Sequence, residues 1–575
     1  MPREQASAAS TVPQEKSSEI AIGSALSYLQ TASLSQKKGK FWSDAEDEIV
    51  ADEIIALMTD EELLAQTFMF GWTGSKPSAL LLDWVAERSL GGVKLFGWNT
   101  ASTEQVAASV TQLQALAAKN RFGIPLFVAT DQEGGLIRHV KGKTSITPGN
   151  LALGASGYPI DAYKSGYYIS RELHALGINM NFAPSVDVYS TSESSIIGTR
   201  SFGSNPEACG ILGAAFAAGS RSAGVIATAK HFPGHGGTGA DSHIVLPRID
   251  ISKKTLDARE LVPFKRLIEE NVEAIMSGHL SFPQLEKDGT PASLSKLFLT
   301  DILRGELGFS GLIITDDMMM NGATFYAGSL AKAVTLSLNA GNDIIMASTT
   351  APLDANLWTQ NLALMRSSRE FRAKIQAAAK RSLMCKLRYF KSPQAAPLYP
   401  ATESIVDFAA PDGARNETIL PDAEGQAFFA EAARRSITLE YPLAFDKSVN
   451  PPIVPIPATE KILLVPNGYT DFEKAAKNYF PHALTDLRIG AKNNAGATVI
   501  ICVSDSADAK TAERYKNSGY RVLVVSVSAP AYAAGLSWTD AIVYTYSASP
   551  FSLDAAFAVI AGKIPATGKM PVAPA

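Results

Sequence analysis

Cysteine is scarce in this chain. The 575 residues include three cysteines, Cys209, Cys385 and Cys502, which lie far apart and form no CxxC pair. An odd number of widely spaced thiols argues against a disulfide framework and against a zinc ribbon. We therefore expect all three to behave as small buried hydrophobic side chains.

The sequence also lacks an excess of one charge and any long apolar run. Its 52 Lys and Arg residues and 56 Asp and Glu residues leave a net charge of -4, which indicates no nucleic-acid partner. No segment has the apolar length of a membrane span, and the N-terminus lacks the apolar core of a signal peptide. The expected compartment is the cytoplasm by default, or the periplasm or cell envelope if a signal peptide has been removed.

Length and composition predict a folded protein of two domains. Hydrophobic residues make up 46% and charged residues 19% of a chain that is too long for one ordinary core. The expected segments are an N-terminal tail and leading helix (1–44), a first domain (45–390), a linker rich in Pro, Ala and Ser (391–425) and a second domain (426–575).

Short apolar runs alternate with helical stretches through the first domain. Helices are expected at Thr103–Ala118 and at Leu256–Glu270, the second of them capped by Thr255. Roughly eight βα units in succession predict an α/β fold of the TIM-type (β/α)8 barrel class, with an open doubly wound sheet as the alternative. The expected strands are Thr67–Gly71, Gly92–Phe96, Leu126–Thr130, Ile178–Ala183, Val225–Ala229, Glu273–Ser277, Leu312–Thr315 and Asp343–Met346.

The second domain repeats the α/β alternation on a smaller scale. A polar turn at 564–569 is expected to lead into one more short apolar strand. We see no catalytic constellation in this half of the sequence. The other strands expected here are Lys461–Val465, Thr498–Val503, Arg521–Val527 and Ala541–Tyr546.

Ionisable residues follow most strands of the first domain. In a barrel the carboxyl ends of the strands converge on one face, where such enzymes place their chemistry. Polar residues also mark ordinary strand ends, but that explanation suits one or two positions better than five. The residues concerned are Asp131, Asp187, Lys230, His231, His279 and Asp316.

The strongest local signal is the glycine-rich segment that runs from Lys230 to His243, KHFPGHGGTGADSH. Such a loop can close over a substrate and carry a proton donor with it. In the pair Asp241-x-His243, a carboxylate could fix the imidazole tautomer, so that His243 protonates a leaving oxygen and later deprotonates water. Two alternatives stay open: His231 and His235 are satisfied loop or core histidines, or the segment binds zinc, although its spacing is not that of HExxH.

A second signal is the apolar strand that ends in the adjacent carboxylates Asp316 and Asp317. On an extended chain these two side chains point to opposite sides, so one can face the barrel axis. We assign Asp316 to the active site, where a carboxylate can act as the nucleophile that forms a glycosyl intermediate. In the alternative, both acids are N-cap residues of the following helix.

Together these motifs resemble the β-N-acetylglucosaminidases of glycoside hydrolase family 3 over about residues 45–385. The second half is similar to the α/β sandwich domain that many members carry, and its PATGKMP at 565–571 resembles the terminal motif of that domain. The matching motifs of the first half are DQEGG (131–135), NFAPxxD (181–187), GTRSFG (198–203), KHFPGHG…DSH (230–243), SGH (277–279) and TDD (315–317).

The resemblance implies double displacement with retention, without a metal or cofactor. Asp316 matches the nucleophile, His243 the general acid/base and Asp241 its carboxylate partner. The expected substrate-binding residues are Asp131, Arg200, Lys230 and His231, which match the first sugar subsite, together with the strand-end residues Asp187 and His279.

Two positions depart from the family pattern: Gly237 replaces a common acid in the loop, and Leu136 replaces a common Arg after DQEGG. Both departures bear on the loop order and the substrate preference, and neither bears on the reaction class. The leading hypothesis is hydrolysis of terminal β-linked N-acetylglucosamine, from GlcNAc-MurNAc muropeptides or other small carbohydrates. The alternatives are a phosphorylase, because a histidine repels phosphate less than a carboxylate does, a metal-dependent hydrolase, and a catalytically silent sugar-binding relative.

Overall fold

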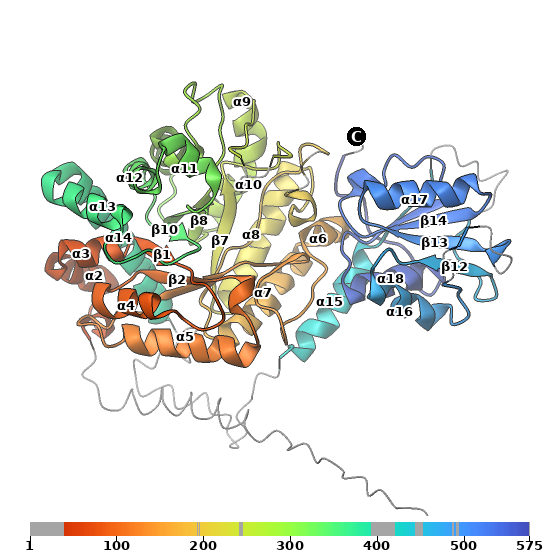
Figure 1. Ribbon diagram of the computed structural model, residues 1–575, viewed down its shortest axis with the longest axis horizontal. Coiled ribbons are helices and arrows are strands. Elements are labelled where there is room, and N and C mark those ends of the chain that lie inside the picture. The colour runs from red at the N-terminus through yellow and green to blue at the C-terminus, as the bar shows by residue number, and fades with distance from the viewer. Residues whose placement is uncertain are drawn as a thin grey trace, which may run out of the picture.

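The computed structural model describes residues 39–192, 194, 196–240, 245–392, 420–442, 452–485, 488–489 and 494–573. Figure 1 shows a barrel beside a second, smaller sheet that is covered by helices. The barrel sheet has eight strands in the order β10-β1-β2-β3-β6-β7-β8-β9, and a bridge between Ile314 and Ile344 joins its two edges. The predicted TIM-type barrel is therefore confirmed, and the open sheet is excluded.

Every strand of the barrel is parallel to its neighbours and buried, which is why the sequence shows them as continuous apolar runs. Side chains such as Met69, Phe127, Met180 and Ile314 form one buried cluster in the barrel, so its interior is a packed core. The strands are β1 (Phe68–Phe70), β2 (Gly92–Leu95), β3 (Phe127–Thr130), β6 (Met180–Asn181), β7 (Ile226–Phe232), β8 (Ala274–Ser277), β9 (Leu312–Thr315) and β10 (Ile345–Ala347).

Helices surround the barrel, and several begin at side-chain caps, for example Ser102 before α5 and Asn205 before α8. The expected cap at Thr255 is wrong: Ser252 is the N-cap and accepts from the Thr255 N–H, and a π-helical turn follows before α10. The helices are α2 (Asp47–Leu57), α3 (Asp60–Ala65), α4 (Ala79–Arg88), α5 (Thr103–Ala117), α6 (Asn150–Ser156), α7 (Pro159–Ala175), α8 (Pro206–Ser222), α9 (Lys253–Thr255), α10 (Leu261–Glu269), α11 (Asn321–Ala327), α12 (Leu330–Ala340), α13 (Asn356–Ser367) and α14 (Arg369–Phe390).

The second domain is an α/β sandwich, as predicted. Its sheet has the order β11-β15-β14-β13-β12, in which β11 (Thr438–Glu440) is antiparallel to β15 and was not expected. The short terminal strand expected after residue 569 is wrong, because residues 570–573 form no strand and pack against the barrel instead. The other elements are β12 (Ile462–Val465), β13 (Thr498–Val503), β14 (Arg521–Ser526), β15 (Ala541–Tyr544), α15 (Ala423–Ser436), α16 (Thr470–Tyr479), α17 (Ser506–Asn517) and α18 (Pro550–Ile560).

The C-terminal segment 568–573 crosses from the second domain to the barrel. Lys569 donates its backbone N–H to the Ala155 carbonyl (2.9 Å), and Pro571 accepts from the Ser204 N–H (3.0 Å). Gly203 lies so close to Pro571, with φ at +145°, that a side chain there would collide with the proline carbonyl. The barrel and the second domain therefore share one packed interface near residues 198–204.

Of the helices that the structure describes, none is both long and apolar enough to cross a bilayer. The three cysteines carry free thiols; Cys209 and Cys502 are buried as expected, and Cys385 is partly buried.

Candidate active site

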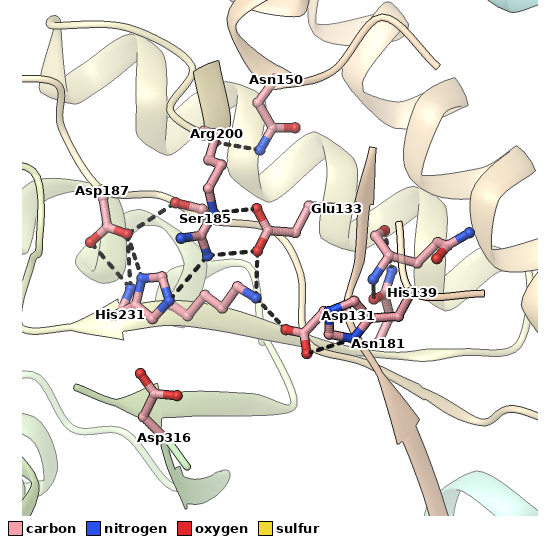
Figure 2. A network of polar contacts seen from close by, with 12 residues as sticks. Asp131, Glu133, His139, Asn150, Asn181, Ser185, Asp187, Arg200, His231 and Asp316 are labelled. Carbon is pink, nitrogen blue, oxygen red and sulfur yellow. Dashed lines mark hydrogen bonds and ion pairs between the residues drawn. The ribbon is translucent and has the colours of Figure 1, made fainter. Parts of the chain in front are cut away.

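The polar groups that follow the barrel strands gather at one end of the barrel, as Figure 2 shows. Asp131 directly follows β3, Asp187 lies beyond β6, and Asp316 directly follows β9. Arg200 ends the short helix η3 (Gly198–Arg200), which lies in the long segment between β6 and α8. The fold therefore brings together residues that are up to 185 positions apart in the sequence, between Asp131 and Asp316.

Lys230 and His231 belong to β7 itself, which continues through Phe232 beyond the strand expected from the sequence. A shift of register between Ala229 and Phe232 accompanies this extension. Both side chains are buried in the barrel mouth, where acidic partners balance their polarity. The apolar pattern ends at Ala229, so hydrophobicity alone placed the strand end too early.

An ion network links four side chains across the site. Lys230 Nζ lies 2.5 Å from Asp131 Oδ1 and 2.5 Å from Glu133 Oε1. Glu133 is gripped in turn by the Arg200 guanidinium, with Nη2 at 2.7 Å from Oε1 and Nε at 2.9 Å from Oε2. This two-point contact fixes the plane of the guanidinium as well as its position.

The network is charged at neutral pH. Burial acts to raise the pKa of Glu133, but Arg200 and Lys230 prevail and lower it to about 2. Burial opposes the charged form of Asp131 too, and Lys230 and Lys94 hold its pKa well below the usual value. Asp131 and Glu133 in turn raise the pKa of Lys230, against the opposing effect of burial. The site therefore offers fixed charges that can bind sugar hydroxyls without further reorganisation.

Asp187 organises the two histidines of the β7 segment. It is 1% exposed, and its Oδ2 lies 2.7 Å from His231 Nδ1. Its Oδ1 accepts from the backbone N–H of His235 (2.6 Å), and Ser185 Oγ donates to Oδ2 (3.0 Å). Burial would raise the pKa of Asp187, but His231 lowers it far below the ordinary value. Asp187 thus fixes the positions of His231 and His235. Substrate binding by Asp187 itself stays a prediction.

This arrangement predicts that Asp187→Ala lowers the free energy of unfolding at pH 7 by about 3–5 kcal/mol, because a buried imidazole and backbone N–H groups lose their acceptor. The pKa of Asp187 is lower in the folded state, so its stabilisation is present above the unfolded pKa of about 3.9 and is lost as the pH falls. Urea unfolding at several pH values should show a gap between wild type and variant that is constant above about pH 5 and shrinks as the pH falls below about 4. The exposed Asp250→Ala serves as a control, within about 0.5 kcal/mol of wild type; a gap independent of pH would contradict the assignment.

Asp316 is the carboxylate at the tip of β9. It accepts the backbone N–H of Asp317 (2.8 Å), and Figure 2 shows its carboxylate directed toward the side of the site that holds His231. Burial raises the pKa of Asp316, but His231 and His279 outweigh this effect, so the pKa is lowered. An ionised carboxylate in this position is suited to attack a sugar carbon rather than to donate a proton.

The neighbouring Asp317 has a different role. Its Oδ1 accepts the backbone N–H groups of Met319 and Ser348, both at 2.9 Å. Helix α11 starts only at Asn321, with Met320 as its N-cap, so neither acid is a helix cap. The two side chains therefore diverge, as expected for adjacent residues at a strand end.

His279 lies behind the Asp316–Asp317 turn and is 1% exposed. Its Nδ1 contacts Ser293 Oγ (2.7 Å), and its Nε2 contacts the Asp317 carbonyl (3.1 Å). In this geometry the ring supports the turn that carries Asp316. Substrate binding by His279 itself stays a prediction.

Asp241 and His243 lie outside the described residues, and so does the rest of 241–244. Their roles as dyad and acid/base stay predictions. His235, on the described part of the same loop, is buried, and burial together with His231 lowers its pKa. Within the described ranges, no three or more His, Cys, Asp or Glu side chains are grouped as a metal site would require.

Sequence reasoning missed three groups of this site, Glu133, Lys94 and His139. Glu133 lies inside the DQEGG motif, yet Asp131 alone was assigned to the substrate. Lys94 is a single charged side chain within the apolar run of β2, and this position in the sequence could have identified it as a buried functional group. His139 follows the hairpin of β4 (Gln132–Gly134) and β5 (Ile137–Arg138), which the sequence did not predict.

Comparison with known proteins shows the family to which the barrel belongs. Residues 58–384, more than half of the chain, match the model of the glycosyl hydrolase family 3 N-terminal domain. A β-hexosaminidase of Methylococcus capsulatus is 36% identical over 292 residues, which cover 50% of this chain and 84% of that protein. β-Hexosaminidase A of Pseudoalteromonas piscicida is 36% identical over 283 residues, and the match spans about half of each protein, 46% of this chain and 47% of that one.

Solved structures extend the likeness to both domains. A glycoside hydrolase family 3 β-N-acetylglucosaminidase from Paenibacillus sp. superposes with a TM-score of 0.77 at 28% identity, over 90% of this chain and 99% of that one. A β-glucoside phosphorylase has the same TM-score of 0.77 at 21% identity, over 92% of this chain and 97% of that one, which shows a shared fold. The family predicted from the motifs is confirmed: with its barrel, its ionised strand-end carboxylates and these relatives, the chain belongs to glycoside hydrolase family 3.

Proposed function

We propose that the chain is a retaining exo-β-N-acetylglucosaminidase that removes terminal β-linked N-acetylglucosamine. The observation that carries the proposal is Asp316, an ionised carboxylate at the tip of β9 that faces the charged groups of the other strand ends. The name of the Paenibacillus relative, a β-N-acetylglucosaminidase, supports N-acetylglucosamine as the sugar, and that of the Methylococcus relative, a β-hexosaminidase, supports a hexosaminide. A substrate of the GlcNAc-MurNAc type, from peptidoglycan, is part of the same proposal.

The reaction has two displacements. In the first, an Asp316 oxygen attacks the anomeric carbon, the glycosidic C–O bond breaks, and His243 gives a proton to the leaving oxygen. In the second, water attacks the same carbon, His243 takes a proton from the water, and Asp316 is released as a carboxylate. Each step inverts the anomeric centre, so the product retains the β configuration.

The fixed charges give this reaction its sugar subsite. Asp131 accepts hydrogen bonds from hydroxyls, and Arg200 and Lys230 donate to sugar oxygens, while the buried Glu133 holds Arg200 and Lys230 in place. All four are held by one another before substrate arrives, so binding costs little conformational entropy. Sugar binding of this kind fixes the ring so that the anomeric carbon lies over Asp316.

Hydrolysis of 4-nitrophenyl β-N-acetylglucosaminide by the full chain, with the β-glucoside as control, tests the proposal. We expect turnover of the former and at least about tenfold lower kcat/KM for the latter, because the β-glucoside lacks the acetamido group. Absence of turnover would overturn the proposal in favour of a sugar-binding protein, which GlcNAc binding would then reveal. Turnover that requires phosphate and yields GlcNAc-1-phosphate would establish a phosphorylase instead.

Faster cleavage of GlcNAc-MurNAc than of chitobiose is the result expected for a peptidoglycan substrate.

A further inference from the structure

Lys94 is a buried lysine of the barrel that the mechanism above leaves unused; burial lowers its pKa, and Asp131 opposes this effect. Its side chain is fully buried, and its Nζ lies 4.0 Å from the centre of the Phe96 ring and 5.5 Å from that of Phe182. Both aromatic side chains belong to the apolar cluster of the barrel. An ammonium in such surroundings is costly unless anionic or polar partners compensate for its lost hydration.

The partner of Lys94 is the carboxylate of Asp131. Lys94 Nζ lies 2.7 Å from Asp131 Oδ2, whereas Lys230 Nζ lies 2.5 Å from the other oxygen, Oδ1. The Leu95 carbonyl accepts a further hydrogen bond from Lys94 (2.9 Å). Each oxygen of Asp131 therefore has its own ammonium, and the plane of the carboxylate is fixed from two directions.

The two lysines differ in what else they hold. Lys230 is shared with Glu133 and belongs to the network that reaches Arg200. Lys94 approaches Asp131 from β2, and its remaining neighbour is His139, with Nδ1 at 3.4 Å. Loss of Lys94 would thus remove the ammonium from Oδ2 of Asp131 and leave the His139 ring beside it, with Nδ1 at 3.5 Å, while the rest of the network stays in contact.

We propose that Lys94 is a positioning residue for substrate recognition: it orients the Asp131 carboxylate toward one hydroxyl of the bound sugar. The inference rests on the proposed function. The Asp131 side chain is 16% exposed, so it can reach a ligand, whereas Lys94 has no exposed surface and acts on the ligand through Asp131. The contribution of Lys94 should therefore depend on the hydroxyl that Asp131 binds.

The pKa of His139 provides a second, independent measurement of the contact between Lys94 and Asp131. Burial is the main cause and Lys94 the next that lower the pKa of His139 to about 4, while Asp131 opposes them. Lys230 and Glu133 also act on the ring, with opposite signs. Removal of the Lys94 charge should therefore raise the pKa of His139, provided that Asp131 stays beside it.

The test compares Lys94→Met with Lys386→Met. Lys386 is the matched control, because it is also a fully buried lysine but contacts Gln66 (3.0 Å) and Phe127 at the opposite end of β3. Steady-state kinetics are measured with 4-nitrophenyl β-N-acetylglucosaminide and with its 3-, 4- and 6-deoxy analogues. We expect Lys94→Met to lower kcat/KM about 10- to 100-fold on the parent, mainly through KM, and less than about threefold on one deoxy analogue.

An equal loss on the parent and on all three analogues, or a loss matched by Lys386→Met, would overturn the proposal and leave Lys94 a structural residue. NMR titration of His139 in Lys94→Met should show a raised pKa; an unchanged value would also count against the contact. If Lys94→Met does not fold, Lys94→Gln is compared with wild type on the same substrates.

Failure of the proposed function has a different outcome. If wild type cleaves none of the glycosides, the hexosaminidase proposal falls, and the Lys94 coupling is then measured as the affinity for GlcNAc and its deoxy analogues by calorimetry. If wild type turns over and the coupling is absent, only the inference about Lys94 falls.

Discussion

Asp316→Ala should lower the turnover of 4-nitrophenyl β-N-acetylglucosaminide by about 10⁴-fold or more, the range found when a catalytic nucleophile is removed. The variant has no oxygen that can form the glycosyl intermediate, while the charged subsite of Asp131, Glu133, Arg200 and Lys230 is untouched. Affinity for GlcNAc should therefore change far less than turnover does. Initial rates, together with calorimetric titration of GlcNAc, measure the two quantities separately.

Azide supplies the control for this variant. A small anion can enter the space left by the Asp316 side chain and displace the leaving group directly, which gives an α-glycosyl azide after a single inversion. Formation of this product shows that the variant is folded and that the missing carboxylate alone limits the rate. Turnover within about tenfold of wild type, or an adduct of a 5-fluoro glycoside on another residue, would contradict Asp316 as nucleophile.

His243→Ala should lower kcat/KM by about 10²–10⁴-fold on a disaccharide, the usual contribution of a general acid. The effect should be much smaller on 2,4-dinitrophenyl β-N-acetylglucosaminide, because this leaving group departs without a proton. With the activated substrate, the second step loses its base and becomes limiting, so kcat falls more than kcat/KM and a burst of phenol appears. Stopped-flow and steady-state rates on both substrates measure these effects.

Asp241→Asn is the companion variant for the proton-transfer prediction. An asparagine can still contact the imidazole but no longer stabilises its protonated form, so a smaller loss with the same dependence on leaving group is expected. Azide added to His243→Ala should yield the β-glycosyl azide, since the intermediate on Asp316 is attacked from the opposite face. A loss in kcat/KM that is equal on both substrates would remove His243 from the role of acid.

Most of the barrel could be predicted from the sequence because its strands are buried on both faces. The run Leu312–Thr315 became β9 with the expected bounds, and β13 likewise matches Thr498–Val503. The prediction failed where polar residues continue a strand. β7 runs on through Lys230 and His231, because Asp131 and Asp187 neutralise those side chains within the site.

The ion pairs of the site were harder to predict than its strands. Lys94 and Asp131 are 37 positions apart, and the two residues approach each other only once β2 and β3 pair with Lys94 opposite Ala129. Asp131 and Asp316 could be proposed from their places after apolar runs, whereas the grip of Arg200 on Glu133 depends on the loop between β6 and α8. Loop geometry of this kind leaves no periodic signal in a sequence.

The C-terminal segment that covers Gly203 has a consequence for how the protein is assembled. Arg200 sits three residues before that glycine, and its carbonyl is held by the Asn150 side chain at the same interface. N-terminal domains commonly fold first during synthesis. If the barrel does so, the loop that carries Arg200 lacks its contact with segment 568–573 until the sandwich domain docks. The sugar affinity that depends on Arg200 is then complete only after the second domain has docked, so the catalytic activity also measures that docking.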